Sequence, residues 1–186
     1  MKTDPLLKII KRCQNGDPDA FASLLSEFGP KLRSYFLRTL TSADDADDML
    51  QELFLKLLVI IRRYKHRGRF ESWLFCVAAN LVRDRYRTRQ RRIKTVSLPA
   101  DDAAYDSQAA AVSREPNPHR QMETAEQLDQ LQRALEELSP SDREIILLRH
   151  YGGLSFKELA EHFQIPMGTA LARVHRGLKK LNKLLT

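Results

Sequence analysis

The sequence has 186 residues, of which 42% are hydrophobic and 30% charged, and it carries a formal net charge of +7 with a pI of about 9.6. A chain of this length buries one modest core or two small ones, and its basic charge suits a polyanionic partner, a membrane surface or simple solubility. No apolar run reaches the ~18 residues of a membrane span, and the N-terminus lacks the apolar core and cleavage site of a signal peptide. We therefore expect a cytoplasmic protein without membrane insertion.

The two cysteines, Cys13 and Cys76, lie far apart and form no CxxC or Cys/His cluster. This usage is typical of a reducing compartment and argues against structural zinc, with a disulfide as the less favoured alternative. We expect no cofactor.

The first clear helical pattern follows residue 17. Asp17 is a suitable N-cap with Pro18 at the first helical position, and apolar residues from Phe21 to Phe28 recur on one side. Gly29 and Pro30 predict a break or bend before a second helical segment.

An acidic, half-apolar helix is predicted after Ser42. Its buried side is Leu50, Phe54, Leu57 and Ile61. The exposed stripe contains Asp45, Asp48 and Glu52, with Gln51 and Leu55 beside it. DNA repels such a surface, so we expect it to bind a basic protein partner. The alternatives are a metal site of Asp44, Asp45, Asp47 and Asp48, and acids placed to favour the helix dipole.

The next predicted helix runs from about residue 71 into a run of arginines. Cys76, Asn80, Arg83 and Arg87 share one face, so an amide able to read a base edge is in line with cations able to hold phosphates. The preceding turn adds a basic and aromatic cluster suited to single-stranded nucleic acid. That cluster consists of Lys65, His66, Arg67, Arg69, Phe70 and Trp73. Core packing is the favoured alternative for each of the two rings.

Residues 95–124 mix acids, alanines, serines and prolines without an apolar stripe, which predicts a flexible linker. An amphipathic helix with leucines from Leu128 to Leu138 follows, and Ser139 and Pro140 end it and begin another. The organisation is that of two small helical domains on a tether.

The C-terminal residues have the outline of a helix-turn-helix. Ser155 and Glu158 fit a capping box, residues 164–166 break the helix, and a basic helix begins near Gly168. On this last helix Ala170, Val174, Leu178 and Leu181 form a packing side, and Arg173, Arg176, Lys180 and Lys183 form a side free to meet DNA. An ordinary solvated charged face is the alternative.

Three segments together resemble the sigma factors of bacterial RNA polymerase, specifically the small extracytoplasmic-function (ECF) group. They are DADDMLQELFLKL, FESWLFCVAANLVRDRYR and LSFKELAEHFQIPMGTALARVHRGLKKL. They stand in the family's order and spacing, and the resemblance covers nearly all of the chain except the linker. Ala79, Gln164, Leu171 and Ala172 depart from the residues usual in the family, so the promoter sequence does not transfer.

The resemblance implies a role for each segment. The acidic helix would bind the beta-prime clamp of core polymerase through Asp45, Asp48, Gln51, Glu52 and Leu55. The next helix and its loop would melt and read the minus-ten element through Lys65, Arg67, Arg69, Phe70, Trp73, Asn80, Arg83, Asp84 and Arg87. The last helix would read the minus-35 element through Thr169, Leu171, Ala172, Arg173, His175, Arg176 and Lys180.

We therefore expect an all-α protein in which residues 1–94 bind polymerase and minus-ten DNA, residues 95–124 link, and residues 125–186 bind minus-35 DNA. The partners implied are core polymerase, through its beta-prime and beta subunits, promoter DNA and an anti-sigma protein, unless control lies in synthesis. The chain itself is expected to do no chemistry. A dimeric helix-turn-helix regulator and, more remotely, a metal-dependent nuclease on the Asp44–Asp48 cluster are the alternatives.

Overall fold

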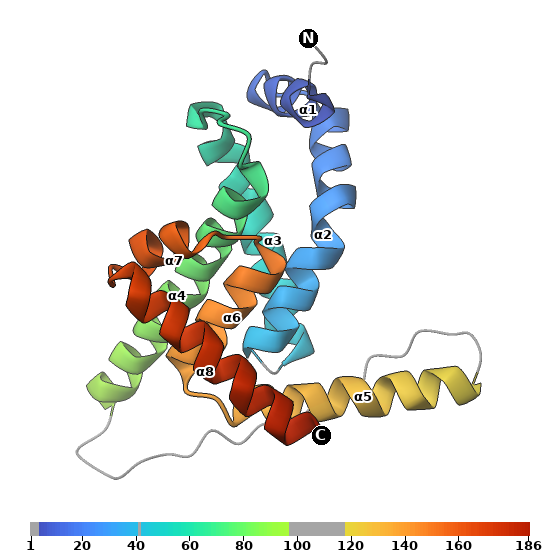
Figure 1. Cartoon of the computed structure of the whole chain (residues 1–186). Coiled ribbons are helices and arrows are strands. Elements are labelled where there is room, and N and C mark those ends of the chain that lie inside the picture. Colours follow the sequence, from blue (N-terminus) through green and yellow to red (C-terminus); the bar gives the residue numbers. More distant parts are fainter. Residues whose placement is uncertain (1–3, 41, 97–117) are drawn as a thin grey trace.

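The computed structural model describes residues 4–40, 42–96 and 118–186, and within these ranges the chain is helical and has no strand (Figure 1). The elements are α1 (Pro5–Gln14), α2 (Pro18–Leu40), α3 (Ala43–Ile60), the 3-10 turn η1 (Ile61–Arg63), α4 (Phe70–Val96), α5 (Pro118–Glu136), α6 (Pro140–Tyr151), α7 (Phe156–Phe163) and α8 (Met167–Leu185). The all-α prediction is confirmed. No helix in the described ranges is long and apolar enough to cross a membrane.

The helix starts follow the expected capping chemistry. The Asp17 carboxylate accepts the backbone N–H groups of Asp19 and Ala20, and the Ser42 hydroxyl accepts that of Asp45. Ser155 and Glu158 form a reciprocal capping box. Each of these side chains satisfies a backbone donor that has no partner within its own helix.

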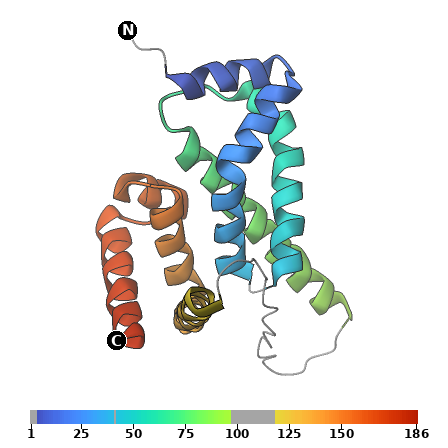
Figure 2. The same cartoon turned by 90° about the vertical axis from the view of Figure 1, so that its right-hand side faces the viewer.

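The N-terminal half is built on α2 and α3, which lie side by side, with α4 crossing them and α1 lying across their end (Figures 1 and 2). Its core side chains are at most 9% exposed. They include Leu24, Phe28, Leu32, Phe36, Met49, Leu53, Leu57, Phe70 and Leu74.

Helix α2 continues through Pro30, so the predicted break is wrong. Pro30 is exposed, and water can therefore reach the carbonyl that loses its helical hydrogen bond. Gly29 is buried, and a Cβ built there would lie 4.0 Å from the Phe54 ring. Packing along the whole length of α2 therefore outweighs the local cost of the Gly-Pro pair.

The C-terminal half packs α5, α6, α7 and α8 around a second group of buried residues. These include Leu135, Leu138, Ile145, Leu148, Leu159, Ala170, Val174 and Leu181. Leu178, predicted on the packing side of α8, is instead 51% exposed, while its neighbour Gly177 is buried. A Cβ on Gly177 would lie 2.3 Å from Ile146 Cδ1, so α8 approaches α6 closely at that glycine.

The two halves are in contact. Helix α6 lies against both α2 and α4, as Figure 2 shows for α2. The Tyr151 ring of α6 lies 6.3 Å from that of Tyr35 and 6.4 Å from that of Phe75. The Ser72 hydroxyl also donates to the Gly152 carbonyl at 2.9 Å. One continuous core therefore joins the two halves in this conformation.

Both ends of the predicted linker are helical. Helix α4 continues to Val96, and α5 begins at Pro118, a residue favoured in the first turn because its ring presets the helical backbone angle. The rest of the predicted linker, residues 97–117, lies outside the described residues.

Candidate functional site

The acidic stripe on α3 divides into a paired end and a free end. Asp45 is half-buried and forms an ion pair with Arg85 of α4, whose guanidinium also lies 3.9 Å from Asp48. The Asp48 side chain is nevertheless 67% exposed, and Gln51 and Glu52 are exposed. Asp48 and Glu52 are therefore available to a partner, whereas Asp45 also holds α3 against α4.

An apolar strip continues the same face toward the end of α3. Leu55 is 66% exposed, Leu58 47% and Val59 71%. Sequence analysis placed only Leu55 here. Leu58 and Val59 follow at spacings of three and four, the signal that would have extended the prediction. An acidic stretch followed by exposed leucine and valine suits a partner that offers both cations and an apolar patch.

Two of the four aspartates that suggested a metal site, Asp45 and Asp47, are paired with arginines. Arg33 donates to both oxygens of Asp47, at 2.6 and 3.0 Å, and this hydrogen bonding, together with the charge of Arg33, holds the pKa of that carboxyl below its ordinary value. Asp45 is paired with Arg85. In residues 4–40, 42–96 and 118–186 no three His, Cys, Asp or Glu side chains are grouped to hold a metal ion.

The turn before α4 presents cations outside and rings inside. Lys65, Arg67 and Arg69 are exposed, whereas Phe70 is 1% exposed. The Phe70 ring packs edge-on against Tyr64 and Phe28, as the core-packing alternative expects. Trp73 is half-buried, with its ring 4.4 Å from that of Tyr64.

The face of α4 that carries Asn80, Arg83 and Arg87, predicted to bind minus-ten DNA, is covered in part by the C-terminal half. Asn80, Asp84 and Arg87 are exposed, but Arg83 points to α6 and α7. Its guanidinium lies 2.8 Å from Glu144 and 2.7 Å from His162 Nε2, and it donates to Asn80 Oδ1 at 3.3 Å.

The groups around Arg83 have shifted acidities. Burial raises the pKa of Glu144, and the charge of Arg83 opposes that rise. Burial, together with the charge of Arg83, lowers the pKa of His162 to about 4. His162 is therefore neutral near pH 7 and accepts a hydrogen bond from Arg83.

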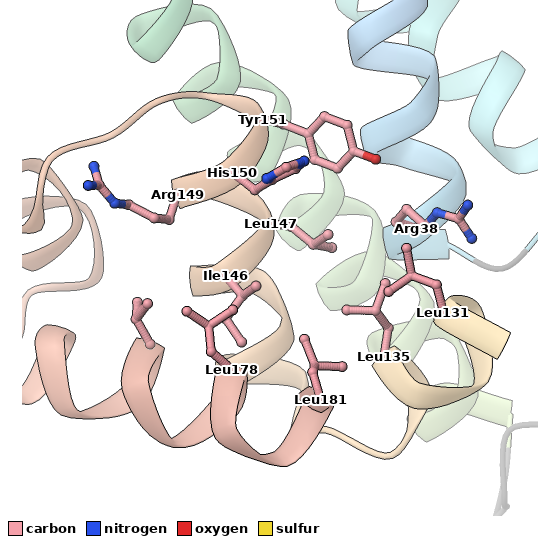
Figure 3. Close-up of a pocket in the computed structure, with 11 residues that line it drawn as sticks. Arg38, Leu131, Leu135, Ile146, Leu147, Arg149, His150, Tyr151, Leu178 and Leu181 are labelled. Atoms are coloured by element: carbon pink, nitrogen blue, oxygen red, sulfur yellow. The ribbon is translucent and has the colours of Figure 1, made fainter. Parts of the chain in front are cut away.

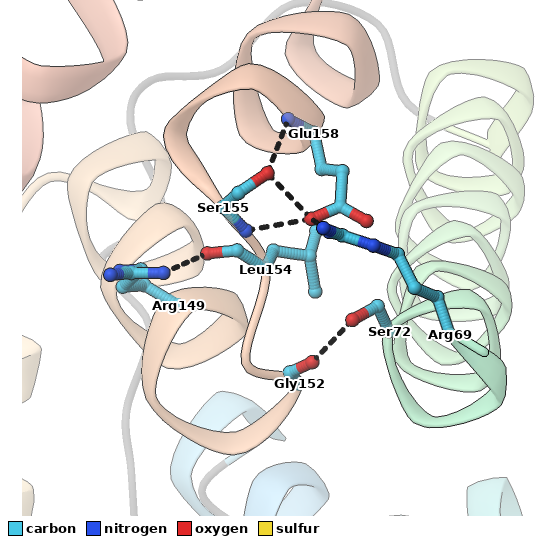
Figure 4. Close-up of polar contacts among 7 residues, drawn as sticks. All are labelled: Arg69, Ser72, Arg149, Gly152, Leu154, Ser155 and Glu158. Atoms are coloured by element: carbon cyan, nitrogen blue, oxygen red, sulfur yellow. Dashed lines mark hydrogen bonds and ion pairs between the residues drawn. The ribbon is translucent and has the colours of Figure 1, made fainter.

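A second polar link joins the turn before α4 to the capping box of α7 (Figure 4). Arg69 forms an ion pair with Glu158, and the same carboxylate accepts the Ser155 backbone N–H at 2.8 Å. Burial raises the pKa of Glu158, but the hydrogen bonds from Ser155 and Arg69 outweigh it, and the net pKa lies below its ordinary value. One carboxylate thus serves both the helix cap and the contact between the halves.

The outward face of α8 stays open. Leu171, Ala172, His175 and Arg176 are exposed, and Thr169 and Arg173 are half-buried. Lys180 is exposed but donates to the Glu137 carbonyl, which ties α8 to the end of α5. The predicted residues Leu171, Ala172, His175 and Arg176 therefore lie on the accessible side of α8, and Thr169 and Arg173 lie at its edge.

A groove of about 580 Å³ lies where α2, α5, α6 and α8 meet (Figure 3). Its floor is apolar, and Arg38, Arg149 and His150 contribute to its lining. The leucine and isoleucine side chains that line it are Leu131, Leu135, Ile146, Leu147, Leu178 and Leu181. Leu178 is exposed because it faces this groove.

Two family models match the chain. Sigma-70 region 2 matches residues 24–92, and Sigma-70, region 4 matches residues 128–181. The first match holds α3 and most of α4, and the second holds the helix-turn-helix.

Curated relatives match along almost the whole chain. The RNA polymerase sigma factor CarQ of Myxococcus xanthus is 33% identical over 176 residues, which are 95% of each chain. The ECF RNA polymerase sigma factor SigW of Bacillus subtilis is 29% identical over 178 residues, which are 96% of this chain and 95% of SigW.

Two solved structures share the fold. The sigma factor RpoE in complex with the anti-sigma factor NepR from Bartonella quintana aligns with a TM-score of 0.65 at 23% identity, over 89% of this chain and 96% of RpoE. CnrH in complex with the cytosolic domain of CnrY aligns with a TM-score of 0.64 at 21% identity, over 95% of this chain and 94% of CnrH.

Proposed function

The chain belongs to the ECF group of sigma-70 factors, which direct promoter-specific transcription initiation by RNA polymerase, and from this premise we propose which surface serves each step. The observation that carries the assignment is the exposed acidic and apolar face of α3 on an otherwise basic chain. A helix-turn-helix regulator acting alone needs no such face. The chemistry of RNA synthesis belongs to core polymerase, and this chain supplies specificity.

The α3 face, defined as Asp48, Gln51, Glu52, Leu55, Leu58 and Val59, binds the beta-prime clamp. Charge at its N-terminal end sets register and association rate, and the apolar residues that follow give burial. Asp45 supports this face from behind through its ion pair with Arg85.

The test reverses charge on the α3 face. Asp48→Lys with Glu52→Lys should leave the fold intact and abolish co-purification with core polymerase, because exposed charge changes cost little stability while like charges at an interface cost several kcal/mol. Glu27→Lys with Glu161→Lys is the matched control, since both acids are exposed and the net charge changes equally. Equal loss of core binding in both double variants would refute the assignment of this face.

The turn before α4 and the exposed side of α4 engage minus-ten DNA. Lys65, Arg67 and Arg69 offer cations to the strand, and Asn80 offers an amide to a base edge. Phe70, being buried, supports the site from within the core. Trp73 is half-buried beside Tyr64 and forms the apolar wall next to the cations.

The outward face of α8 engages minus-35 DNA. Arg173, His175 and Arg176 follow one another on a helix whose opposite side is packed on α6, as a recognition helix in the major groove requires. The proposed division into residues 1–94 and 125–186 keeps one DNA surface in each half, and the family matches to residues 24–92 and 128–181, which fall one in each part, support it.

Promoter binding requires the halves to separate. Arg83 and Arg69, proposed to meet the DNA backbone, are neutralised here by Glu144 and Glu158 of the C-terminal half. DNA phosphates and these carboxylates compete for the same cations, so the chain described here is a state that precedes promoter engagement.

An anti-sigma protein is the proposed regulator. One of the two structural relatives, RpoE, is a sigma factor in complex with an anti-sigma factor, and the groove between α2, α5, α6 and α8 has an apolar floor with Arg38, Arg149 and His150 around it. An amphipathic helix with acidic residues beside its apolar stripe fits that chemistry.

A further inference from the structure

Helix α1 holds the turn that leads into α4. This helix precedes residues 24–92, the segment matched as region 2, and sequence analysis assigned it no role. It buries Ile10 and Cys13 against the rest of the N-terminal half and lies across the end of α3 (Figure 2). Its two ends contact the segment from Ile61 to His66.

Gln14, the last residue of α1, makes two hydrogen bonds far along the chain. Its Nε2 donates to the Ile61 carbonyl at 3.0 Å and to the Tyr64 carbonyl at 2.7 Å. A glutamine amide nitrogen carries two hydrogens, so both donors are used. The Ile61 carbonyl also accepts the Tyr64 N–H at 3.0 Å within the 3-10 turn, so Gln14 binds the first carbonyl of that turn and the carbonyl that follows it, where the helical hydrogen-bond pattern ends.

The other end of α1 reaches the same segment. Asp4, whose carboxylate caps α1 by accepting the Leu6 N–H, lies 3.4 Å from His66 Nε2. The His66 side chain is only 12% exposed, and its Nδ1 is buried with no hydrogen-bond partner among the described residues. The backbone is therefore held at Tyr64, and the side chain two residues later is held as well.

The held segment carries the proposed minus-ten cations. Beyond Tyr64 the chain runs through Lys65 and Arg67, turns at Gly68 with a φ of 73°, and enters α4. The Tyr64 ring also packs against the Trp73 ring at a tilt of 37°, so the Tyr64 carbonyl is held by Gln14 and its ring by α4. The direction in which the backbone leaves Tyr64 determines where the following cations point.

We propose that Gln14 is a positioning residue for minus-ten recognition: it fixes the shape of the turn at residues 64–69 before DNA arrives, and it does not touch DNA itself. The inference rests on the proposed role of this turn in minus-ten binding. A turn already ordered loses less conformational entropy when it captures a strand, so the benefit appears in the capture and opening step. Helix α8 lies elsewhere, and the acids of the α3 face, Asp48 and Glu52, precede Ile61 by more than two helical turns.

The experiment uses the full chain with core polymerase and a duplex promoter carrying a fluorescent base in the minus-ten element. Gln14→Leu removes both donors at similar volume, Gln14→Lys restores a donor, and Lys11→Ala is the control from the exposed side of α1. We expect Gln14→Leu to slow opening roughly tenfold, the scale of one or two net hydrogen bonds. Gln14→Leu should also reduce the differences in opening rate between promoters that carry different bases in the minus-ten element.

Three further readouts separate positioning from general damage. Core binding, minus-35 preference and the melting temperature of the free chain are measured for every variant, and Gln14→Lys should recover part of the minus-ten preference. Slower opening with an unchanged base preference, or a minus-35 preference that falls in parallel, would overturn the inference. Opening at the wild-type rate would overturn it as well.

Arg67→Ala distinguishes this inference from the function on which it rests. If Arg67→Ala alters minus-ten opening and Gln14→Leu does not, the positioning role alone is wrong. If neither variant alters it, the turn has no part in minus-ten binding and the proposed function of this turn fails first.

Discussion

Asn80 is the residue on which the proposed reading of the minus-ten element depends most directly. It is exposed on α4, and its side-chain oxygen accepts a long hydrogen bond of 3.3 Å from Arg83. Asn80→Ala should lower transcription from a duplex promoter and change the base preference at one minus-ten position, because a lost base contact is typically ~1–3 kcal/mol of discrimination. Transcription from a library of minus-ten variants measures this. A uniform loss over all variants would make Asn80 a backbone or structural residue.

His162 makes the contact between the halves dependent on pH. Packed on Arg83 it has a pKa of about 4, and in a separated chain it regains an ordinary value near 6.5. Between these two pKa values the separated form therefore binds more protons than the packed form. A fall in pH from 7 toward 5 favours separation. Glu144, whose pKa is raised by burial, gains a proton more readily in the packed form and opposes the effect at the acidic end.

The measurement is the radius of gyration of the free chain from pH 7.5 to 5. The wild type should expand as the pH falls, and His162→Gln, which stays neutral, should remove most of that dependence. An identical pH profile in the two proteins would place the titrating group elsewhere.

Helical spacing placed most of the tested residues on the correct side of their helix, with Leu178 as an exception. It placed Asn80, Asp48 and Arg176 on open faces and Leu57 in the core, because each follows from spacing along one helix. It did not find the partners of Arg83, since Glu144 and His162 lie 61 and 79 residues away in the chain. Contacts at such separations leave no periodic signal.

The turn between α7 and α8 contains a residue in the left-handed conformation. Gln164 ends α7 in the left-handed conformation, with a φ of 53°, and it is the one described residue other than glycine with a positive φ. Gln164→Gly should stabilise the chain by up to about 1 kcal/mol, because glycine adopts this conformation without strain. Thermal unfolding measures the change.

The matched control is the same substitution inside a helix. Gln130→Gly on the exposed side of α5 should destabilise by about 0.5–1 kcal/mol. Equal effects of the two substitutions would show that the left-handed conformation at residue 164 carries no cost.

Element boundaries were predictable where a cap marks them. Asp17, Ser42, Ser139 and Ser155 each accept a backbone N–H of the helix that they open, because short polar side chains favour that position. The break at Pro30 was wrong because tertiary packing along α2 outweighs a local rule. Helix α1 was missed, although Asp4 and Pro5 form the same start signal as Asp17 and Pro18.

At the scale of the whole molecule, the sequence predicted two helical domains and left their relative placement undetermined. The residues that join them carry no distinctive sequence signal. They include Tyr151, Ser72, Gly152, Glu144 and Glu158. Gly152 shows how close the approach is, since a Cβ there would lie 2.8 Å from that of Phe75. Only the folded chain brings these residues onto the surface proposed to meet DNA.

Charge reversal at Glu144 tests whether that packing restrains DNA binding. Glu144→Lys places a cation beside Arg83, whose side chain is 35% exposed, so like charges meet in a partly desolvated contact and should drive α6 from α4. The free chain should expand in small-angle scattering. Its affinity for a single-stranded minus-ten oligonucleotide should rise about tenfold, because Arg83 and Arg69 are released from their carboxylates.

Two comparisons show whether the rise comes from opening or from added positive charge. Glu161→Lys makes the same charge change at an exposed position of α7, so it should raise affinity only slightly and leave the radius of gyration as in the wild type. Arg83→Glu combined with Glu144→Lys restores opposite charges, so it should return the chain to its compact size. If Glu161→Lys raises the affinity as much as Glu144→Lys does, or if the Glu144→Lys chain stays compact, the contact between the halves places no restraint on DNA binding, and the two domains act independently from the start.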